Sequence, residues 1–219
     1  MTEIDYEQAR FNMIEQQIRP WEVLDSRVLD VLGSVPREDY VPARYRALAF
    51  TDVGIPLGHG EVMMNPNVEG RLLQAVTIRP DDRVLEVGTG SGFLSTCLAR
   101  LGGEVTSVDI RPEFTSAAAD KLRRHGVENV RLETGDAARD WGDRRFDVVV
   151  LSGSLPELFE SWKQRLAVRG RLFAIVGGPP VMEAILVTRV AEREWFTESL
   201  FETAIPPLKN AHKPVAFEF

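Results

Sequence analysis

From Pro80 onward, short runs rich in β-branched residues alternate with segments whose apolar residues recur at helical spacing. The runs are RVLEVG (83–88), EVTSVDI (104–110), VRLETGD (130–136), FDVVVLSG (146–153) and RLFAIVGG (171–178), and helices are predicted over 94–101, 114–122 and 158–166. Strands joined by helices of this length need crossover connections, which make neighbouring strands parallel and cover both faces of the sheet. The pattern predicts an α/β fold with a doubly wound, mostly parallel, Rossmann-like sheet.

The last forty residues lack this alternation. AILVTRV (184–190) and FTESLFETAIPPL (196–208) follow each other with no helix between them. Two strands joined by so short a connection are expected to pair antiparallel, here at the edge of what becomes a seven-stranded sheet. A parallel sheet closed by such a hairpin is familiar from methyltransferases, which is an analogy at the level of fold.

Before residue 79, prolines separate short helical stretches. Two apolar stripes are predicted, one before Pro20 and one after a cap at Asp25 or Ser26; their members are Phe11, Ile14, Ile18, and then Leu24, Val28, Val31 and Leu32. A third helix is expected to begin at Pro66, with Asn65 as its cap. We expect residues 1–78 to form N-terminal helices and a substrate-side loop, packed as one structural unit on a core formed by residues 79–219.

Composition excludes several classes of protein. Asp and Glu number 33 against 26 Lys and Arg, for a net charge of −7, so nothing indicates a nucleic-acid partner. The first twenty residues have no apolar signal core, and no apolar run approaches the roughly 20 residues of a membrane helix. The single cysteine, Cys97, excludes an internal disulfide. We expect a cytoplasmic protein with no membrane partner, monomeric or weakly dimeric.

A glycine-rich loop follows the first predicted strand, where a doubly wound sheet binds its ligand. Gly88, Gly90 and Gly92 have the spacing G-x-G-x-G, whereas the dinucleotide fingerprint G-x-G-x-x-G needs a glycine where this chain has Phe93. The spacing favours S-adenosyl-L-methionine over a nicotinamide dinucleotide. The choice decides between a methyltransferase and an oxidoreductase.

Three acids close three successive strands: Glu86, Asp109 and Asp136. Glu86 is expected to attract the cationic groups of the methionine moiety, directly or through water, whereas it would repel a pyrophosphate. Asp109 is expected to reach the ribose hydroxyls and Asp136 the adenine amino group. With their neighbours Thr89, Ile110 and Ala137, these acids and the three loop glycines form the predicted cofactor site.

Each feature also has a purely structural interpretation. Glycines after a strand serve tight turns, Asp109 can cap the turn at Arg111, and Gly135-Asp136 can be a turn pair. Three acids at successive strand ends on one side of a sheet have little structural purpose, however. Their conjunction favours an adenosyl cofactor.

Several segments resemble protein-L-isoaspartate O-methyltransferases over nearly the whole chain. They are MIEQQIR (13–19), RVLDVLGSVPREDYVP (27–42), YRALAFTDVGIPLGHGE (45–61), LEVGTGSGFLS (85–95), TGDAA (134–138) and VGGPPVMEAIL (176–186). The resemblance implies transfer of a methyl group to the free α-carboxylate of an isoaspartyl residue in damaged protein, followed by collapse of the ester to a succinimide and a route back to aspartate. It places the substrate beside His59 and Gly60 of the IPLGHG segment.

The implied chemistry agrees with what the sequence lacks. A carboxylate with a pKa of roughly 3.5 is already ionised at neutral pH, so it needs alignment and shielding from water but no general base. The histidines His59, His125 and His212 are scattered and show no metal-binding spacing. We expect no metal.

One departure falls in the substrate loop. Where the family has G-Q-T-I-S-x-P, this chain has GEVMMNP (60–66), so both hydroxyls are missing and Met64 takes the serine position. A thioether cannot donate a hydrogen bond to a carboxylate. Either backbone amides of the loop replace the hydroxyl, or this is a divergent branch with another, apolar acceptor. No catalytic residue is assigned, and Ser152 and Ser154 after the fourth strand are further candidates for the acceptor pocket.

The leading hypothesis is an isoaspartyl-carboxyl methyltransferase that takes S-adenosyl-L-methionine and a damaged protein or peptide. The alternatives are a divergent methyltransferase with another protein or small-molecule acceptor, and a non-catalytic S-adenosylmethionine-binding protein. An oxidoreductase is the remote fourth possibility.

Overall fold

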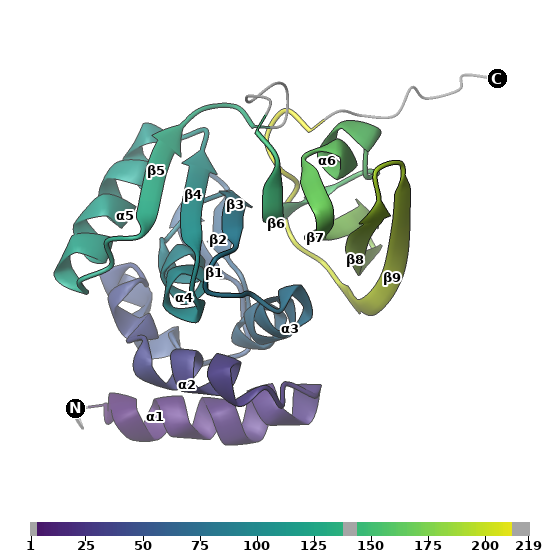
Figure 1. Ribbon diagram of the computed structural model, residues 1–219. Coiled ribbons are helices and arrows are strands. Elements are labelled where there is room, and N and C mark those ends of the chain that lie inside the picture. The colour runs from purple at the N-terminus through teal and green to yellow at the C-terminus, as the bar shows by residue number, and fades with distance from the viewer. Residues whose placement is uncertain (1–3, 138–143, 212–219) are drawn as a thin grey trace.

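The computed structural model describes residues 4–137 and 144–211 of the chain. Its centre is a seven-stranded sheet in the order β5-β4-β3-β6-β7-β8-β9 (Figure 1). The strands are β3 (Arg83–Val87), β4 (Glu104–Asp109), β5 (Val130–Thr134), β6 (Phe146–Leu155), β7 (Leu166–Gly178), β8 (Val181–Ala191) and β9 (Glu194–Thr203). The first five pair in parallel, and β8 and β9 add an antiparallel hairpin. The predicted fold class is confirmed.

Alternate residues of the strands point to opposite faces of the sheet, as the two-residue period of a strand requires. Val84 and Val148 join a large apolar cluster on one face, and Leu85 and Val149 join a second cluster on the other. Both faces are therefore buried, which explains why the strand sequences read as nearly continuous apolar runs.

Helices α4 (Phe93–Leu101), α5 (Pro112–Arg124) and α6 (Glu160–Gln164) connect parallel strands as predicted, and α3 (Pro66–Val76) precedes β3. Helix α3 begins at Pro66 after Asn65, as the sequence indicates, and it buries Val68, Leu72, Leu73 and Val76. Helix α6 is shorter than expected, because Leu166 already begins strand β7.

The N-terminal helices α1 (Tyr6–Met13) and α2 (Ser26–Ser34) lie beneath α3 and α4 in Figure 1. Asp25 caps α2 by accepting a hydrogen bond from the amide of Arg27. Of the predicted stripe, Ile18 is buried and Ile14 packs against the core, but Phe11 is wrong: it is 59% exposed, and Met13 is buried in its place. A π-helical turn over Ile14–Ile18 follows α1. A wider turn shifts the phase of the buried stripe relative to a regular α-helix.

The helix ends at Ile18, before Pro20 as expected, and a single 3₁₀ turn over Arg19–Trp21 follows it. One further expectation in this region is wrong. Leu24 is exposed because it precedes the cap of α2. The large apolar cluster joins Met13 and Ile18 to the sheet without interruption. The division into 1–78 and 79–219 stays a prediction.

Two segments lie at the carboxyl ends of the parallel strands. One is a hairpin of β1 (Ile55–Gly58) and β2 (Glu61–Met63). The other follows β9: the predicted strand over 196–208 stops at Thr203, and residues 205–208 run back to the end of β6. Pro206 and Pro207 have no amide proton to give to a strand ladder, which explains why the strand ends before them.

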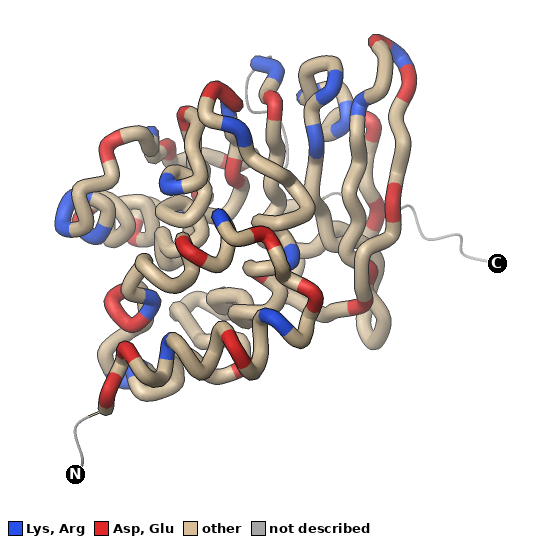
Figure 2. Tube along the Cα trace, turned by 60° about the horizontal axis from the view of Figure 1, so that its bottom comes forward, with Lys and Arg blue, Asp and Glu red and all other residues tan. Residues whose placement is uncertain are grey.

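Charged residues are interspersed along the trace in Figure 2, where Lys and Arg alternate with Asp and Glu over most elements. The last turn of α5 is basic, with Lys121, Arg123 and Arg124. Within 4–137 and 144–211, none of the helices combines the length and the apolar character needed to cross a membrane.

Candidate cofactor and acceptor site

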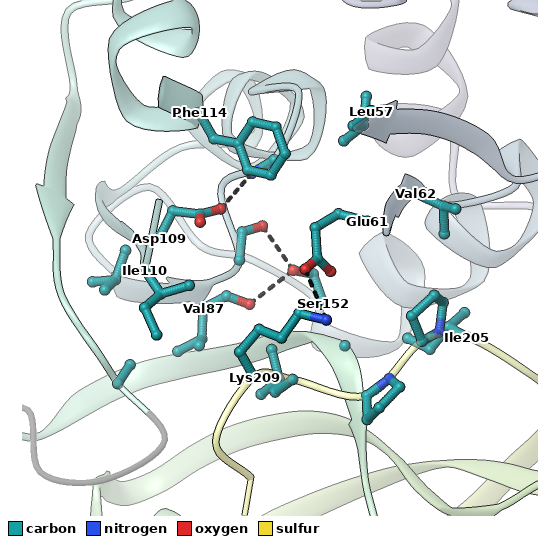
Figure 3. A pocket seen from close by; sticks show the side chains of 18 of the residues that line it. Leu57, Glu61, Val62, Val87, Asp109, Ile110, Phe114, Ser152, Ile205 and Lys209 are labelled. Atoms are coloured by element: carbon teal, nitrogen blue, oxygen red, sulfur yellow. Dashed lines mark hydrogen bonds and ion pairs between the residues drawn. The ribbon is translucent and has the colours of Figure 1, made fainter. Parts of the chain in front are cut away.

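A cleft opens where the carboxyl ends of β3, β4, β5 and β6 meet the β1–β2 hairpin and the segment after β9 (Figure 3). It encloses about 730 Å³ of space that is continuous with solvent. Its lining comprises Leu57, Glu61, Val62, Met64, Val87, Gly88, Gly90, Val108, Asp109, Ile110, Phe114, Gly135, Asp136, Ala137, Ser152, Gly153, Ile205, Pro206, Pro207, Leu208 and Lys209. The cleft therefore lies at the carboxyl ends of the parallel strands, where the sequence predicts a bound ligand.

The glycine loop forms the floor of this cleft. Gly88 has φ of +100° and Gly90 +49°, conformations that L side chains rarely adopt. A Cβ on Gly88 would lie 2.2 Å from the Ser152 hydroxyl oxygen, so the backbone needs glycine there to approach β6. Gly92 does not line the cleft; it caps α4, and a Cβ there would lie 2.9 Å from that of Ala118.

Asp109 holds the glycine loop against the end of β4. One carboxylate oxygen accepts a hydrogen bond from the Gly90 amide at 2.9 Å, and the other accepts one from the Arg111 amide at 2.9 Å. Burial raises the pKa of Asp109, and these two amides oppose that shift. The carboxylate both caps the turn at Arg111 and lines the cleft, so its structural role is confirmed and its role towards a ribose stays a prediction.

Glu86 lies elsewhere than expected. Its side chain is fully buried on the α4 face of the sheet and does not line the cleft, because residue 86 shares the face of Val84 and not that of Val87. The Ser95 hydroxyl donates a hydrogen bond to it. Burial raises the pKa of Glu86 to about 8, so the carboxyl group is largely protonated at neutral pH. Direct attraction of a cationic ligand by Glu86 is not supported by this position.

Thr89 is also part of the layer beneath the loop. Its side chain is buried, and its hydroxyl lies 2.6 Å from that of Ser107 in β4, which in turn is 3.3 Å from the Ser95 hydroxyl. Thr89 and Glu86 thus belong to one buried polar network that supports the loop from behind. Neither is placed to contact a ligand in the cleft by its side chain.

The residues predicted to surround the adenine lie together in the cleft. Ile110, Asp136 and Ala137 all line the cleft, next to Asp109 and Gly135. Asp136 accepts a hydrogen bond from the Asn210 amide group at 2.7 Å. The segment after β9 therefore contacts the end of β5 across the cleft.

The predicted substrate loop is the β1–β2 hairpin. His59 and Gly60 form its tight turn, with φ of +56° and +80°, and both are exposed and do not line the cleft. The turn projects beyond the cleft because a two-residue hairpin turn stands at the far end of its strands. The His59 ring packs edge-on against Phe114, a lining residue, at 5.9 Å between ring centroids.

Met64 does line the cleft, and it is nearly buried at 5% exposure. Its carbonyl accepts a hydrogen bond from Arg37 at 2.6 Å. The apolar side chains of Leu57 and Val62 line the same wall. At the place where the family carries a hydroxyl, this chain presents a thioether in an apolar wall.

Of the two candidate serines, only one lies in the cleft. Ser152 lines the cleft, with its hydroxyl 2.7 Å from the carbonyl oxygens of both Val87 and Gly88. Ser154 does not: it is 1% exposed, and its hydroxyl donates to the Ile205 carbonyl at 3.0 Å. The segment after β9 pairs with Ser154 and covers it. The sequence could not indicate this contact, because Ser154 and Ile205 are far apart along the chain.

Several lining residues were missed from the sequence as site candidates. They include Leu57, Glu61, Phe114, Leu208 and Lys209. The one available signal was the Pro-Pro pair at 206–207, which forbids a regular strand and indicates that the chain leaves the sheet.

Metal chemistry has no support in the described part of the chain. None of the His, Cys, Asp and Glu residues of 4–137 and 144–211 form a group of three or more that could hold a metal ion. His125 pairs with Asp39 at 3.2 Å, away from the cleft, and His212 lies outside the described residues.

Known proteins share both the sequence and the fold. The family model for protein-L-isoaspartate(D-aspartate) O-methyltransferase matches residues 8–209. Protein-L-isoaspartate O-methyltransferase 1 of Rhodopseudomonas palustris (strain HaA2) is 34% identical over 201 residues, which cover 91% of this chain and 82% of that protein. Protein-L-isoaspartate O-methyltransferase of Roseiflexus castenholzii (strain DSM 13941 / HLO8) is 32% identical over 210 residues, which cover 95% of each chain.

A structure of the Plasmodium falciparum family representative, in complex with S-adenosyl-L-homocysteine, has a TM-score of 0.79 to this chain. It covers 94% of this chain and 99% of its own at 18% identity, a likeness that concerns the fold. The family model covers most of the chain, and the relatives share about a third of its residues, so these two comparisons show family membership as well as fold. This chain belongs to the protein-L-isoaspartate(D-aspartate) O-methyltransferase family.

Proposed function

We propose that this protein transfers the methyl group of S-adenosyl-L-methionine to the free carboxylate of isoaspartyl residues in proteins or peptides. Family membership supports this activity. The observation that carries it is the cleft itself, in which a glycine floor, Asp109 and Asp136 meet an apolar wall formed by the hairpin. One side of the cleft suits a nucleoside and the other an acceptor.

The lining residues fit the cofactor. Asp109 accepts hydrogen bonds from the ribose hydroxyls, with Gly88 and Gly90 beneath the methionine moiety. Ile110 and Ala137 pack on the adenine, and Asp136 accepts from its amino group. The absence of side chains at 88 and 90 lets a ligand approach the backbone closely.

The chemistry needs little from the protein beyond placement. S-adenosyl-L-methionine supplies an electrophilic methyl group on a sulfonium. The acceptor carboxylate is ionised at neutral pH, and no histidine or cysteine is among the described residues that line the cleft. Leu57, Val62 and Met64 exclude water from the acceptor side, which strengthens the attraction between the carboxylate and the sulfonium. The protein acts by alignment and desolvation.

A second candidate function follows from Met64. A buried thioether between Leu57 and Val62 also suits an apolar acceptor, so a divergent methyltransferase with another substrate is the alternative. We further propose that the protein works in the cytoplasm as a monomer or weak dimer, without a nucleic-acid or membrane partner. The acidic net charge of −7 supports the part of this proposal that concerns nucleic acid.

The test uses purified protein, radiolabelled S-adenosyl-L-methionine and a peptide with one isoaspartyl residue. The aspartyl form of the same peptide is the control. Base-labile methyl ester on the isoaspartyl form alone supports the proposed activity. If calorimetry shows donor binding and neither peptide is methylated, the divergent methyltransferase or a non-catalytic binding protein replaces the proposal.

A further inference from the structure

Three charged side chains from separate elements converge at the acceptor side of the cleft. Glu61 belongs to β2, Arg111 precedes α5, and Lys209 lies in the segment after β9. One Glu61 oxygen, Oε1, is 3.3 Å from Lys209 Nζ and 3.6 Å from Arg111 Nη2. Figure 3 shows the Glu61 carboxylate pointing into the cleft towards Lys209, beside Ser152.

This cluster is only partly exposed. The side chains of Glu61 and Arg111 are 23% and 27% exposed, and that of Lys209 is 44% exposed. The Glu61 oxygen that faces both cations has no hydrogen bond of normal geometry. A shielded carboxylate held by charge alone is easier to replace than one fixed by directional bonds.

The acceptor carboxylate needs a partner that Met64 cannot supply. The Met64 side chain cannot donate, and its carbonyl is already an acceptor for Arg37. Among the described residues that line the cleft, Lys209 is the one with a positive charge. Its ammonium is therefore the available partner for an anionic acceptor.

We propose that Lys209 recognises the carboxylate of the acceptor and that Glu61 is an internal counter-ion that competes with it. Glu61, Lys209 and Arg111 together carry one excess positive charge, which the neighbouring Asp109 carboxylate balances, so an incoming carboxylate pairs with Lys209 by displacing Glu61. Glu61 sets specificity by weakening the binding of acceptors whose carboxylate cannot displace it. This inference rests on the proposed function.

The opposite role for Glu61 is attraction of a cationic acceptor. Glu61 already lies within 4 Å of two cations, so an added ammonium would have to displace Lys209 or Arg111 from it. The arrangement therefore favours an anionic acceptor, and attraction of a cationic one is an outcome that the test can reveal.

The test compares Lys209→Met and Glu61→Gln with the wild-type protein in isoaspartyl peptide methylation. Lys209→Met is expected to raise KM for the peptide about tenfold, the effect of losing one charge-assisted hydrogen bond, and Lys209→Arg to retain most of the affinity. Glu61→Gln is expected to lower KM several-fold. The KM for S-adenosyl-L-methionine should stay within about twofold in all three variants. Lys163→Met and Glu160→Gln, a partly exposed pair at 3.8 Å on α6, are matched controls.

An unchanged peptide KM in Lys209→Met, or a raised one in Glu61→Gln, would overturn the inference. If the wild type methylates no peptide, the proposed function fails, but the role of Lys209 can still be tested by peptide binding. This experiment titrates the protein, with S-adenosyl-L-homocysteine present, with the isoaspartyl peptide and with its α-carboxamide. A preference for the carboxylate that disappears in Lys209→Met supports the inference. Equal binding of both peptides, or tighter binding of a lysine-containing control peptide, contradicts it.

Discussion

Arg37 and Glu69 form an ion pair in which the two side chains are 0% and 2% exposed. The same guanidinium donates to the Ala49 carbonyl at 2.8 Å and to the Met64 carbonyl at 2.6 Å. Burial raises the pKa of Glu69 to about 7, and the charge of Arg37 opposes that shift. One buried cation thus ties the substrate loop to helix α3.

Replacing Arg37 by methionine should therefore lower the free energy of unfolding. The change leaves Glu69 and two carbonyl groups buried without their partner, which costs about 3 to 5 kcal/mol. Urea denaturation followed by circular dichroism measures the loss. Arg123→Met, in an exposed pair with Asp120, should change stability by less than about 0.5 kcal/mol. Equal effects of the two substitutions would contradict the structural role of Arg37.

Asp109→Ala should weaken donor binding. The variant loses the partner proposed for the ribose and the carboxylate that fixes the Gly90 amide, so we expect a loss of about 1 to 3 kcal/mol. Calorimetric titration with S-adenosyl-L-homocysteine measures it, with Asp120→Ala on the exposed face of α5 as control. Unaltered affinity would mean that the ribose lies elsewhere.

Met64→Ser should raise kcat/KM for an isoaspartyl peptide. The new hydroxyl faces the cleft and can donate to the acceptor carboxylate, an effect of roughly fivefold to tenfold for one hydrogen bond. Met63→Ser is the control, because Met63 is equally buried but does not line the cleft. A fall in activity in a folded Met64→Ser protein would show that the loop binds its acceptor in another way.

Gly88→Ala should abolish tight donor binding. The methyl group would lie 2.2 Å from the Ser152 hydroxyl oxygen at a φ of +100°, so the loop must shift, at about 2 kcal/mol or more. Gly178→Ala, where a Cβ meets nothing within 4 Å, is the control. The double variant with Ser152→Gly should recover part of the affinity. An unaffected single variant would refute the close approach of the loop to β6.

Glu86 should make stability depend on pH. Its pKa rises from 4.5 to about 8 because of burial, so between these values the folded protein holds a proton that the unfolded chain releases. Stability is therefore highest below about pH 4.5 with respect to this group and falls as pH rises through about 8. Glu86→Gln removes the titration and should be more stable than wild type at pH 9 by roughly 1 to 3 kcal/mol.

Thermal unfolding between pH 6 and pH 9 measures this difference. Glu104→Gln, on the exposed start of β4, should follow the wild-type profile. If the wild type and Glu86→Gln change in parallel over this range, Glu86 is ionised in the folded protein.

The sequence by itself determined much of the local structure and the class of the sheet, though not the order of its strands. Asp25 and Pro66 start helices in the structure as their side chains predict, since capping and the fixed φ of proline act within a few residues. The alternation of strands and helices was enough for the parallel sheet, and the short connection near Ala191 was enough for the final hairpin. The position of Asp109 at a strand end followed directly.

Only the tertiary structure decided which side chains share the cleft. Residue 86 lies one position from Val87 in the sequence, yet it faces the opposite side of the sheet, where burial leaves its carboxyl largely protonated. Glu61 and Lys209 are separated by most of the chain and meet because residues 205–208 run back over the end of β6. Local propensities carry no information about such returns of the chain. The strand ends therefore placed Asp109, Ile110, Asp136 and Ala137 in the cleft but not Glu86, whereas the acceptor side required the packed molecule.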